Sequence, residues 1–509
     1  MTAPATSGAA LLPDDEYDRA LLAQVHPADW VNPAPRDRYH LVVIGAGTAG
    51  LVTAAAAAGL GARVALVERH LMGGDCLNVG CVPSKGMLSA AHAWHSARQA
   101  SGAFGGPPLA GDGDFAQAMT RMRRLRAQLA PVDGAARFQS MGVDVFLGAG
   151  RFAGRNVIAV NDAVLRFRRA VIATGARASV PPIPGLAESG FLTNETVFTL
   201  TTRPARVAVI GSGPIGCELA QAFQRLGSQV TMLTRDGGIL PRDDRDAARL
   251  VAASLESDGV TIVTGVEILS VSRTGGTTTL QLRRHGEVSR LDVDQVLVAT
   301  GRTPNVEGLE LQAAGVRATA QGIEVDDRLR TANPAVYAVG DVASRYKFTH
   351  AADAQARLVV QNALFYGRAR ASRLVIPWCT YTSPEVAQAG LTEADATARG
   401  IAADVVQLDF GHLDRAVLDG ETTGVLKVVL ARGTDRILGA TLVAAHAGEM
   451  IGEVALAMTN GLGLSAIGRT IHPYPTQAEV FRKAADQWRK RKLTPRVRQL
   501  FNWWFRTFT

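Results

Sequence analysis

The chain has 509 residues, of which 47% are hydrophobic and 20% are charged, and its formal net charge at pH 7 is +8. This length exceeds what one hydrophobic core supports, so we expect three or four structural domains. No run of 18 apolar residues occurs, which argues against a membrane-spanning helix. Four cysteines are too few for a disulfide framework and favour a cytoplasmic protein.

The excess positive charge is concentrated at the C-terminal end. The segment 487–509 contains no acidic residue and seven cations, so 8 − 7 leaves the rest of the chain near +1. Because the charge belongs to this tail, we expect no nucleic acid partner. The seven cations are Arg489, Lys490, Arg491, Lys492, Arg496, Arg498 and Arg506.

Residues 1–38 mix alanine, proline and acids, and lack the basic start and apolar run of a secretion signal. Asp14–Val25 predicts a short helix with acids in its first turn. We expect this segment to be a surface extension.

A dinucleotide-binding pattern follows directly. Leu41–Ile44 predicts a buried parallel strand, and a glycine-rich turn comes next. Gly45 allows the tight turn, Gly47 lets the backbone approach a pyrophosphate, and Gly50 lets helix and strand pack closely. The next strand ends at Glu68, at 68 − 50 = 18 positions past the last glycine, where an acid can bind ribose hydroxyls.

A second unit of the same kind begins with the strand Arg206–Ile210. At the position equivalent to Glu68 it carries Thr234, since 234 − 216 = 18. Loss of the acid removes repulsion toward a 2′-phosphate, and Arg235 and Arg242 add positive charge, so NADPH is favoured, with NADH as the alternative. The glycines of this turn are Gly211, Gly213 and Gly216.

Two cysteines lie between these units, in the stretch 73–85, which reads Gly-Gly-Asp-Cys-Leu-Asn-Val-Gly-Cys-Val-Pro-Ser-Lys. Cys76 and Cys81 are five positions apart, and one turn of chain can bring them within disulfide geometry. A dithiol between two nucleotide-binding units indicates electron flow from nicotinamide through flavin to sulfur.

The stretch 73–85 closely resembles the active-site signature of the pyridine nucleotide-disulfide oxidoreductases, which include dihydrolipoamide dehydrogenase, glutathione reductase and mercuric reductase. The resemblance extends from Tyr39 to Trp488 and implies an α/β homodimer that uses FAD and NAD(P)H. It implies two Rossmann-like dinucleotide-binding domains and a C-terminal α+β dimerisation domain. The expected segments are an N-terminal extension (1–38), an FAD-binding domain (39–185 and 302–372), an NAD(P)-binding domain (186–301), a dimerisation domain (373–488) and a basic aromatic tail (489–509).

The resemblance also assigns roles to individual residues. Cys81 would lie against the flavin as the charge-transfer thiolate, and Cys76 would be the outer interchange thiol. Lys85 would reach the flavin ring and pair with Glu218 of the second unit. Asp341 would contact the ribityl chain of the flavin.

Other segments predict the elements that surround this site. Ser84–Ala100 and Phe115–Arg137 predict two helices. Thr349 is a candidate N-cap for a helix at His350–Leu364, whose amides would stabilise a reduced flavin. We expect His350 to be structural. Cys217 and Cys379 fit small core residues better than ligands, and we predict no resident metal site.

The C-terminal signature departs from the disulfide-reducing relatives. They carry His-Pro-Thr with a glutamate five positions after the histidine, and this couple manages the thiol proton. Here Glu479 is retained, but Tyr474 takes the place of the histidine, and His472 lies two residues earlier. Tyrosine is a weak base because its ordinary pKa is about 10. The same replacement occurs in mercuric reductase, where the tyrosine helps to bind the metal ion.

The expected activity is therefore mercuric reductase-like reduction of a thiol-reactive acceptor, either a soft metal ion or a disulfide. The site would lie between Cys76 of one subunit and Tyr474 of the other. Mercuric reductase also has a C-terminal cysteine pair, but this chain has no cysteine after Cys379, which leaves the acceptor open. The alternative is a dihydrolipoamide dehydrogenase or glutathione reductase type with His472 as acid/base. A third hypothesis is an attached electron-transfer flavoprotein without a small substrate.

The tail predicts an amphipathic basic helix. It would lie at an anionic membrane surface, such as the inner membrane, or pack against the dimer or a partner helix. The apolar side chains at helical spacing are Leu493, Val497, Leu500, Phe501, Trp504 and Phe508.

Overall fold

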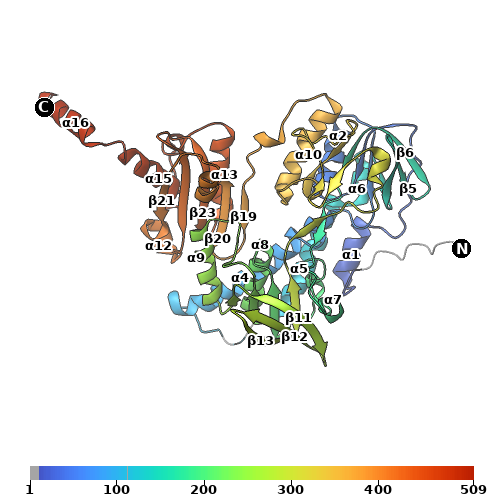
Figure 1. Cartoon of the computed structure of the whole chain (residues 1–509), viewed down its shortest axis with the longest axis horizontal. Coiled ribbons are helices and arrows are strands. Elements are labelled where there is room, and N and C mark those ends of the chain that lie inside the picture. The colour runs from blue at the N-terminus through green and yellow to red at the C-terminus, as the bar shows by residue number, and fades with distance from the viewer. Residues whose placement is uncertain (1–10, 110, 112, 509) are drawn as a thin grey trace. The chain divides into compact units, whose positions relative to one another are not determined.

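The computed structural model describes residues 11–109, 111 and 113–508, which form a mixed α/β structure of the predicted class. They divide into two compact units, whose elements are labelled in Figure 1. The first unit comprises Met1–Gly211, Ala222–Leu233 and Gly265–Leu374, and the second comprises Ser212–Gln221, Thr234–Thr264 and Val375–Thr509.

The first unit is built on a sheet whose central strands are parallel. Its order is β3-β2-β1-β6-β5-β4, and β18 pairs with β6. In the register, Val43 of β1 lies opposite Leu66 of β2 and Val171 of β6. Nearly all residues of β1 and β2 are buried, as the continuous apolar runs predict. The strands are β1 (Tyr39–Ile44), β2 (Val64–Glu68), β3 (Val143–Leu147), β4 (Gly150–Gly154), β5 (Val157–Val160), β6 (Ala163–Ile172) and β18 (Val336–Ala338).

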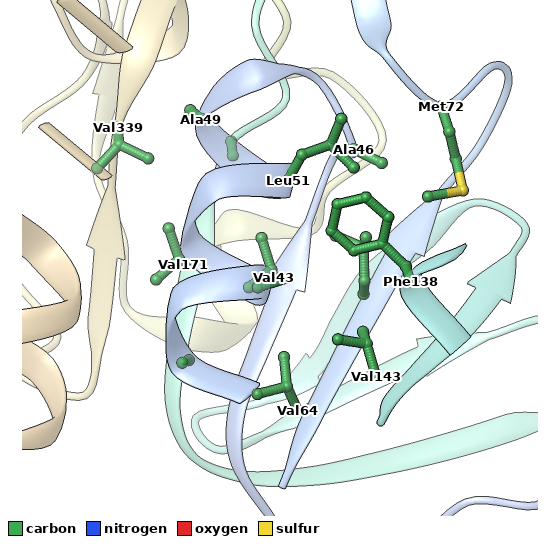
Figure 2. Packing of buried hydrophobic residues seen from close by; sticks show 14 of the residues in the cluster. Val43, Ala46, Ala49, Leu51, Val64, Met72, Phe138, Val143, Val171 and Val339 are labelled. Atoms are coloured by element: carbon green, nitrogen blue, oxygen red, sulfur yellow. The ribbon is translucent and has the colours of Figure 1, made fainter. Parts of the chain in front are cut away.

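Helices α2 (Thr48–Gly59) and α10 (Thr349–Leu364) pack against each other beside this sheet. Figure 2 shows the apolar cluster around α2, which includes Val43 and Val171 of the sheet, Leu51 of the helix and Val339 after β18. The core fixes the start of α2 over the carboxyl ends of the strands, where ligands of such sheets bind.

Helix α4 (Cys81–Ala103) begins three residues earlier than predicted, and Cys76 lies in the short helix α3 (Gly74–Asn78). The single helix predicted for Phe115–Arg137 is wrong. It is divided into α5 (Phe115–Leu129), the 3₁₀ turn η1 (Ala130–Asp133) and α6 (Ala135–Ser140). Pro131 lacks a backbone donor, and Gly134 has extended dihedral angles, so the helix cannot continue.

The second nucleotide-binding pattern forms the expected parallel sheet. Strand β8 (Arg206–Ile210) pairs with β9 (Gln229–Leu233) and β14 (Gln295–Val298), and the predicted bounds of β8 are confirmed. Helix α8 (Pro214–Arg225) follows the glycine turn. A separate antiparallel sheet contains β11 (Glu267–Thr274), β12 (Thr277–Arg284) and β13 (Glu287–Val293).

The second unit contains a five-stranded antiparallel sheet, in the order β19-β20-β23-β22-β21. Side chains of helices α13 and α15, among them Ile451 and Phe481, join the strands in one apolar core. The strands are β19 (Trp378–Thr380), β20 (Glu385–Gly390), β21 (Ala403–Asp409), β22 (Val425–Ala431) and β23 (Ile437–Ala444). The helices are α9 (Arg245–Ser257), α11 (Glu393–Ala398), α12 (Asp414–Asp419), α13 (Ala447–Thr459), α14 (Leu464–Ile467), α15 (Glu479–Lys490) and α16 (Pro495–Phe508).

Helix α1 (Glu16–Val25) lies in the core of the first unit, which differs from the surface extension we expected. Leu21 and Val25 are fully buried. Asp18 is also buried and accepts a hydrogen bond of 2.6 Å from Arg126 of α5, which donates another of 2.8 Å to the carbonyl of Asn78. This ion pair joins α1 and α5 to the end of α3, two residues past Cys76. Among the described residues, no helix is both long and apolar enough to cross a membrane.

We predict that Asp18→Ala lowers the free energy of unfolding by about 3 kcal/mol, because it leaves the Arg126 guanidinium buried without its partner. Denaturant unfolding measures this loss. The matched control is Asp353→Ala, which breaks the partly exposed Asp353–Arg357 pair and should cost less than about 0.5 kcal/mol. Equal losses for both variants would contradict a stabilising role for the buried pair.

Candidate active site

The glycine turn after β1 is in direct backbone contact with the start of the cysteine segment. The amide of Gly73 donates a hydrogen bond of 2.8 Å to the carbonyl of Ala46, and Gly47 and Gly73 form a parallel bridge. A Cβ on Gly74 would lie 2.6 Å from the Cα of Gly47. Because no side chain fits between the two segments, the cysteine segment is held directly on the predicted pyrophosphate turn.

The turn itself has the geometry that the sequence predicts. Gly45 has a φ of +100°, and a Cβ there would lie 2.4 Å from the carbonyl oxygen of Ala173. A Cβ on Gly50 would lie 1.8 Å from the carbonyl oxygen of Gly45, so only glycine permits this approach of helix and turn. Gly47 is the N-cap of α2 and has no side-chain capping bond, which leaves the helix amides directed at the turn.

Glu68 ends β2 beside this turn and is buried. Its carboxylate accepts hydrogen bonds of 2.7 Å from the amide of Ala46 and 2.8 Å from the amide of His70. Burial raises the pKa of Glu68, while the two amides oppose this shift. The amides therefore orient both carboxylate oxygens, which keep further lone pairs for ribose hydroxyls.

The two predicted redox cysteines are neighbours, and no disulfide joins them in this structure. Cys76 is half-buried in α3, and Cys81 is the first residue of α4. The hydrogen bond with Cys81 and burial raise the pKa of Cys76, and the hydroxyl of Thr349 opposes this shift. The Sγ of Cys81 lies 3.3 Å from the Oγ1 of Thr349.

Thr349 has a different position from the one predicted. It is the first residue of α10, and the N-cap is Phe348, which makes no side-chain capping bond. Its hydroxyl is therefore available to the thiols, a contact that the sequence pattern did not predict. The ring of His350 stacks on that of Phe348 with a centroid distance of 5.5 Å.

Asp341 lies in the same region, next to Gly340, which has a φ of +72°. A Cβ on Gly340 would lie 3.2 Å from the Cβ of Ala49 in α2. Gly340 and Asp341 therefore lie close to the glycine turn at the start of α2. The carboxylate of Asp341 lies 3.3 Å from the Nε of Arg302. Burial raises the pKa of Asp341, while the charge of Arg302 opposes the shift.

Arg302 was not predicted, and it connects Asp341 with the cysteine segment. Its guanidinium also forms an ion pair with Asp75, the residue before Cys76, and donates a hydrogen bond of 2.6 Å to the carbonyl of Ala176. The buried Nε makes no hydrogen bond within the described part of the chain. No local pattern could reveal this bridge, because Asp75 and Arg302 are 227 positions apart.

These residues fit a bound FAD. The turn at Gly45–Gly50 and the amides of α2 suit the pyrophosphate, Glu68 suits the adenosine ribose, and Asp341 suits the ribityl hydroxyls. The structure thus gathers the predicted flavin-binding residues and both cysteines at one end of the parallel sheet.

The second glycine turn resembles the first in its geometry. Gly211 has a φ of +109°, and a Cβ there would lie 2.5 Å from the carbonyl oxygen of Ala299. Gly213 has open space at its Cβ position, as an approaching ligand requires. Thr234, at the position of the ribose-binding acid, is buried and accepts a hydrogen bond of 2.9 Å from the hydroxyl of Ser212.

Arg235 and Arg242, which we predicted to bind a 2′-phosphate, are both exposed. Arg245 at the start of α9 was not predicted. Its guanidinium donates hydrogen bonds to the carbonyls of Ile239, Leu240 and Asp243, and so it supports the loop that carries Arg242. Gly216, the third glycine of this turn, is buried in α8.

Lys85 and Glu218, a predicted pair, lie in different units. Lys85 is half-buried in α4, one turn after Cys81. Glu218 is buried in α8 and accepts a hydrogen bond of 2.9 Å from the amide of Tyr381. Their mutual pairing stays a prediction. Cys217 is fully buried, and burial raises its pKa, while Cys379 borders the core of the second unit.

Tyr474 and His472 differ sharply in their surroundings. The Tyr474 side chain is 70% exposed, and its hydroxyl donates a hydrogen bond of 2.9 Å to Asp414. This bond to Asp414 raises the pKa of Tyr474. The His472 side chain is only 6% exposed.

Both ring nitrogens of His472 are engaged. Nε2 lies 3.0 Å from Glu453, and Nδ1 lies 3.1 Å from the carbonyl oxygen of Thr470. Glu479 is buried at the start of α15 and pairs with Arg482, which the sequence pattern did not predict.

Comparison with known proteins extends these observations. The family model described as pyridine nucleotide-disulphide oxidoreductase matches residues 39–356, and that of its dimerisation domain matches residues 376–485. A mercuric reductase of Staphylococcus aureus is 35% identical over 448 residues, covering 88% of this chain and 82% of that protein. A dihydrolipoyl dehydrogenase of Thermus scotoductus is also 35% identical, over 474 residues, covering 89% of this chain and 98% of that protein.

Among solved structures, the Cu(II) complex of the HOCl-induced flavoprotein disulfide reductase RclA from Escherichia coli is similar to this chain. The TM-score is 0.79 and the sequence identity 29%, and the match covers 89% of this chain and all of the other.

We predict that Thr349→Val slows alkylation of Cys76 in the reduced protein several-fold at neutral pH. The hydroxyl of Thr349 lowers the pKa of Cys76, so its loss moves the thiol midpoint to higher pH. Iodoacetamide labelling followed across pH by peptide mass spectrometry measures the shift. Thr349→Ser retains the hydroxyl and is the control. An unchanged profile in Thr349→Val would contradict the contact.

Proposed function

We propose that this chain, which belongs to the pyridine nucleotide-disulphide oxidoreductase family, passes electrons from NADPH through FAD and the Cys76–Cys81 pair to a thiol-reactive acceptor. The observation that carries this proposal is the convergence of both cysteines, the glycine turn and Asp341 at one end of the parallel sheet. This arrangement supports two-electron reduction through the dithiol, because a flavin bound beside the cysteine pair would be a two-electron donor.

The turn at Gly45–Gly50, Glu68 and Asp341 would hold FAD, which would supply the two electrons that open the Cys76–Cys81 disulfide. The Cys76–Cys81 bond then breaks, and each sulfur remains on its cysteine as a thiol or thiolate. Thr349 stabilises negative charge on the sulfurs through its hydroxyl. Cys76, as the outer thiol, meets the acceptor, and two electrons leave as the S–S bond forms again.

A soft metal ion is the acceptor that we favour. Two thiolates are the ligands that such ions prefer, and one Hg(II) ion takes both electrons, whereas Cu(II) takes one electron per ion. Two observations support a metal. A curated relative is a mercuric reductase, and a structural neighbour is a Cu(II) complex. We place the acceptor between Cys76 and Tyr474 of the partner subunit.

A low-molecular-weight disulfide is the second candidate acceptor, and the dihydrolipoyl dehydrogenase relative supports it. In that case an acid must protonate the leaving thiolate. His472 was our candidate, but both its ring nitrogens are occupied by Glu453 and Thr470. This geometry favours a structural role for His472.

The nucleotide preference is also a proposal. Thr234 and Ser212 bond to each other where an acid would bind the ribose of NADH, and the exposed Arg235 and Arg242 are positive charges nearby in sequence. Both features favour the 2′-phosphate of NADPH. The dimerisation domain supports a homodimer.

We predict that anaerobic NADPH titration produces a long-wavelength thiolate–flavin absorbance in the wild-type chain and in Cys76→Ser, but not in Cys81→Ser. Both variants should lose turnover by at least about a thousandfold, because each removes one half of the dithiol. Stopped-flow spectra followed by addition of Hg(II), Cu(II) or a disulfide identify the acceptor that reoxidises the protein. NADH in parallel tests the nucleotide preference.

Absence of the long-wavelength band in the wild type would contradict the assigned electron path. If no acceptor supports steady NADPH consumption, the alternative of an attached electron carrier without a small substrate is favoured instead.

We predict that Tyr474→Phe lowers metal-dependent turnover by about tenfold or more, because the phenol oxygen is lost beside the metal. His472→Ala should retain turnover and lower the free energy of unfolding by about 1–2 kcal/mol, since it removes two hydrogen bonds. Steady-state kinetics and denaturant unfolding separate these effects. Tyr366→Phe, at another exposed tyrosine, is the control. Selective loss of disulfide turnover in His472→Ala would instead support the disulfide reductase alternative.

A further inference from the structure

Helix α16 exposes side chains on all its faces. None of its residues is buried, although it carries six large apolar side chains that are 46% to 63% exposed. A contiguous exposed apolar patch of this kind marks an interaction site more often than a free surface. The six are Leu500, Phe501, Trp503, Trp504, Phe505 and Phe508.

The apolar side chains gather on one side of the helix. Because successive residues turn by about 100°, five of them fall within an arc of about 100°. Rings on this side contact each other. The centroids of Trp504 and Phe508 are 4.2 Å apart, while Phe505, whose centroid is 6.5 Å from that of Phe501, lies just outside this arc. The five residues are Val497, Leu500, Phe501, Trp504 and Phe508.

The remaining sides are basic. Arg496, Arg498 and Arg506 lie outside the apolar arc, and the segment 487–509 contains no acidic residue. Trp503 lies on this polar side, next to Arg496 in the helical projection. Of the cations before the helix, Arg489 and Arg491 donate hydrogen bonds to carbonyls of the second unit. The three arginines of α16 and the exposed Lys490 and Lys492 before it make this end of the chain strongly cationic.

The helix lies beyond the segments that carry the redox chemistry. The family's dimerisation-domain match ends at residue 485, ten residues before α16 begins. Helix α16 therefore lies outside the part of the chain that the family models match, and that match assigns it no role.

We infer that α16 binds the surface of a bilayer that contains anionic phospholipid. Its apolar side enters the boundary between headgroups and acyl chains, and its arginines bind lipid phosphates as bidentate donors. Tryptophan suits this boundary because its ring is apolar and its indole N–H is polar. Each arginine near an anionic surface adds to the attraction, and salt screens it.

Charge complementarity favours a lipid surface over a second copy of the helix. Pairing two apolar faces would bring two sets of seven cations together without one compensating acid. Like charges at such distances oppose association. An anionic bilayer supplies both the apolar phase and the counter-charge.

Vesicle co-sedimentation of the full-length, FAD-loaded protein tests this inference. At about 0.1 M salt, we expect binding to vesicles of phosphatidylglycerol and phosphatidylcholine that is at least about tenfold tighter than binding to phosphatidylcholine alone, and that weakens in about 1 M salt. The triple variant Arg496→Glu/Arg498→Glu/Arg506→Glu and the double variant Trp504→Ser/Phe508→Ser should each lose at least about tenfold in affinity. The matched control Gln499→Ala/Asn502→Ala should bind as wild type.

Three outcomes would overturn the inference. One is equal vesicle binding by wild type and both tail variants. The second is a higher oligomer that sedimentation velocity detects for the full chain but not for a chain ending at residue 492, because α16 would then cover another copy. The third is tighter binding to a single-stranded oligonucleotide than to anionic vesicles. NADPH-driven turnover should remain unchanged in every tail variant, so failure here is distinguishable from failure of the proposed redox function.

Discussion

The backbone contact between the first glycine turn and the cysteine segment determines the geometry of the whole site. The bridge between Gly47 and Gly73, and the 2.6 Å that a Cβ on Gly74 would leave to Gly47, bring α3 onto the N-terminal end of α2. A side chain at Gly74 would push the two segments apart. Since the cysteines follow within the next residues, the position of the dithiol depends on a contact that contains no side chains.

Beside this contact, two carboxylates share one cation. A single guanidinium, that of Arg302, lies between Asp75 before the outer cysteine and Asp341 after β18. Burial of Asp341 raises its pKa and so opposes its ionisation, whereas the positive charge of Arg302 favours the ionised form. Thus the residue that we expect to touch the flavin and the residue beside Cys76 share one cation. A change in the charge of one carboxylate would then be felt by the other.

Sequence patterns predicted the parts of this site that are local. Strands β8 and β9 and the two glycine turns follow from apolar runs and from glycines that tolerate positive φ, as at Gly45 and Gly211. Pro131 indicates the break after α5, but the helical periodicity continues past it and favoured one long helix. Contacts across the sequence had no such signal. Thr349 was interpreted as a cap because it precedes a helix, but its hydroxyl contacts Cys81, 268 positions away.

The surroundings of Tyr474 help to choose between a disulfide and a metal ion as the acceptor, because the two reductions differ in the protons they take up. A disulfide acceptor is reduced to two thiols and so takes up protons. A histidine that titrates near neutral pH can supply them. Reduction of Hg(II) or Cu(II) consumes none. The hydrogen bond to Asp414 raises the pKa of Tyr474, which therefore remains a neutral phenol that donates to Asp414 and keeps oxygen lone pairs for another partner. A neutral oxygen that neither gives nor takes a proton is suited to a metal ion between thiolates, whereas it leaves the proton demand of a disulfide unmet.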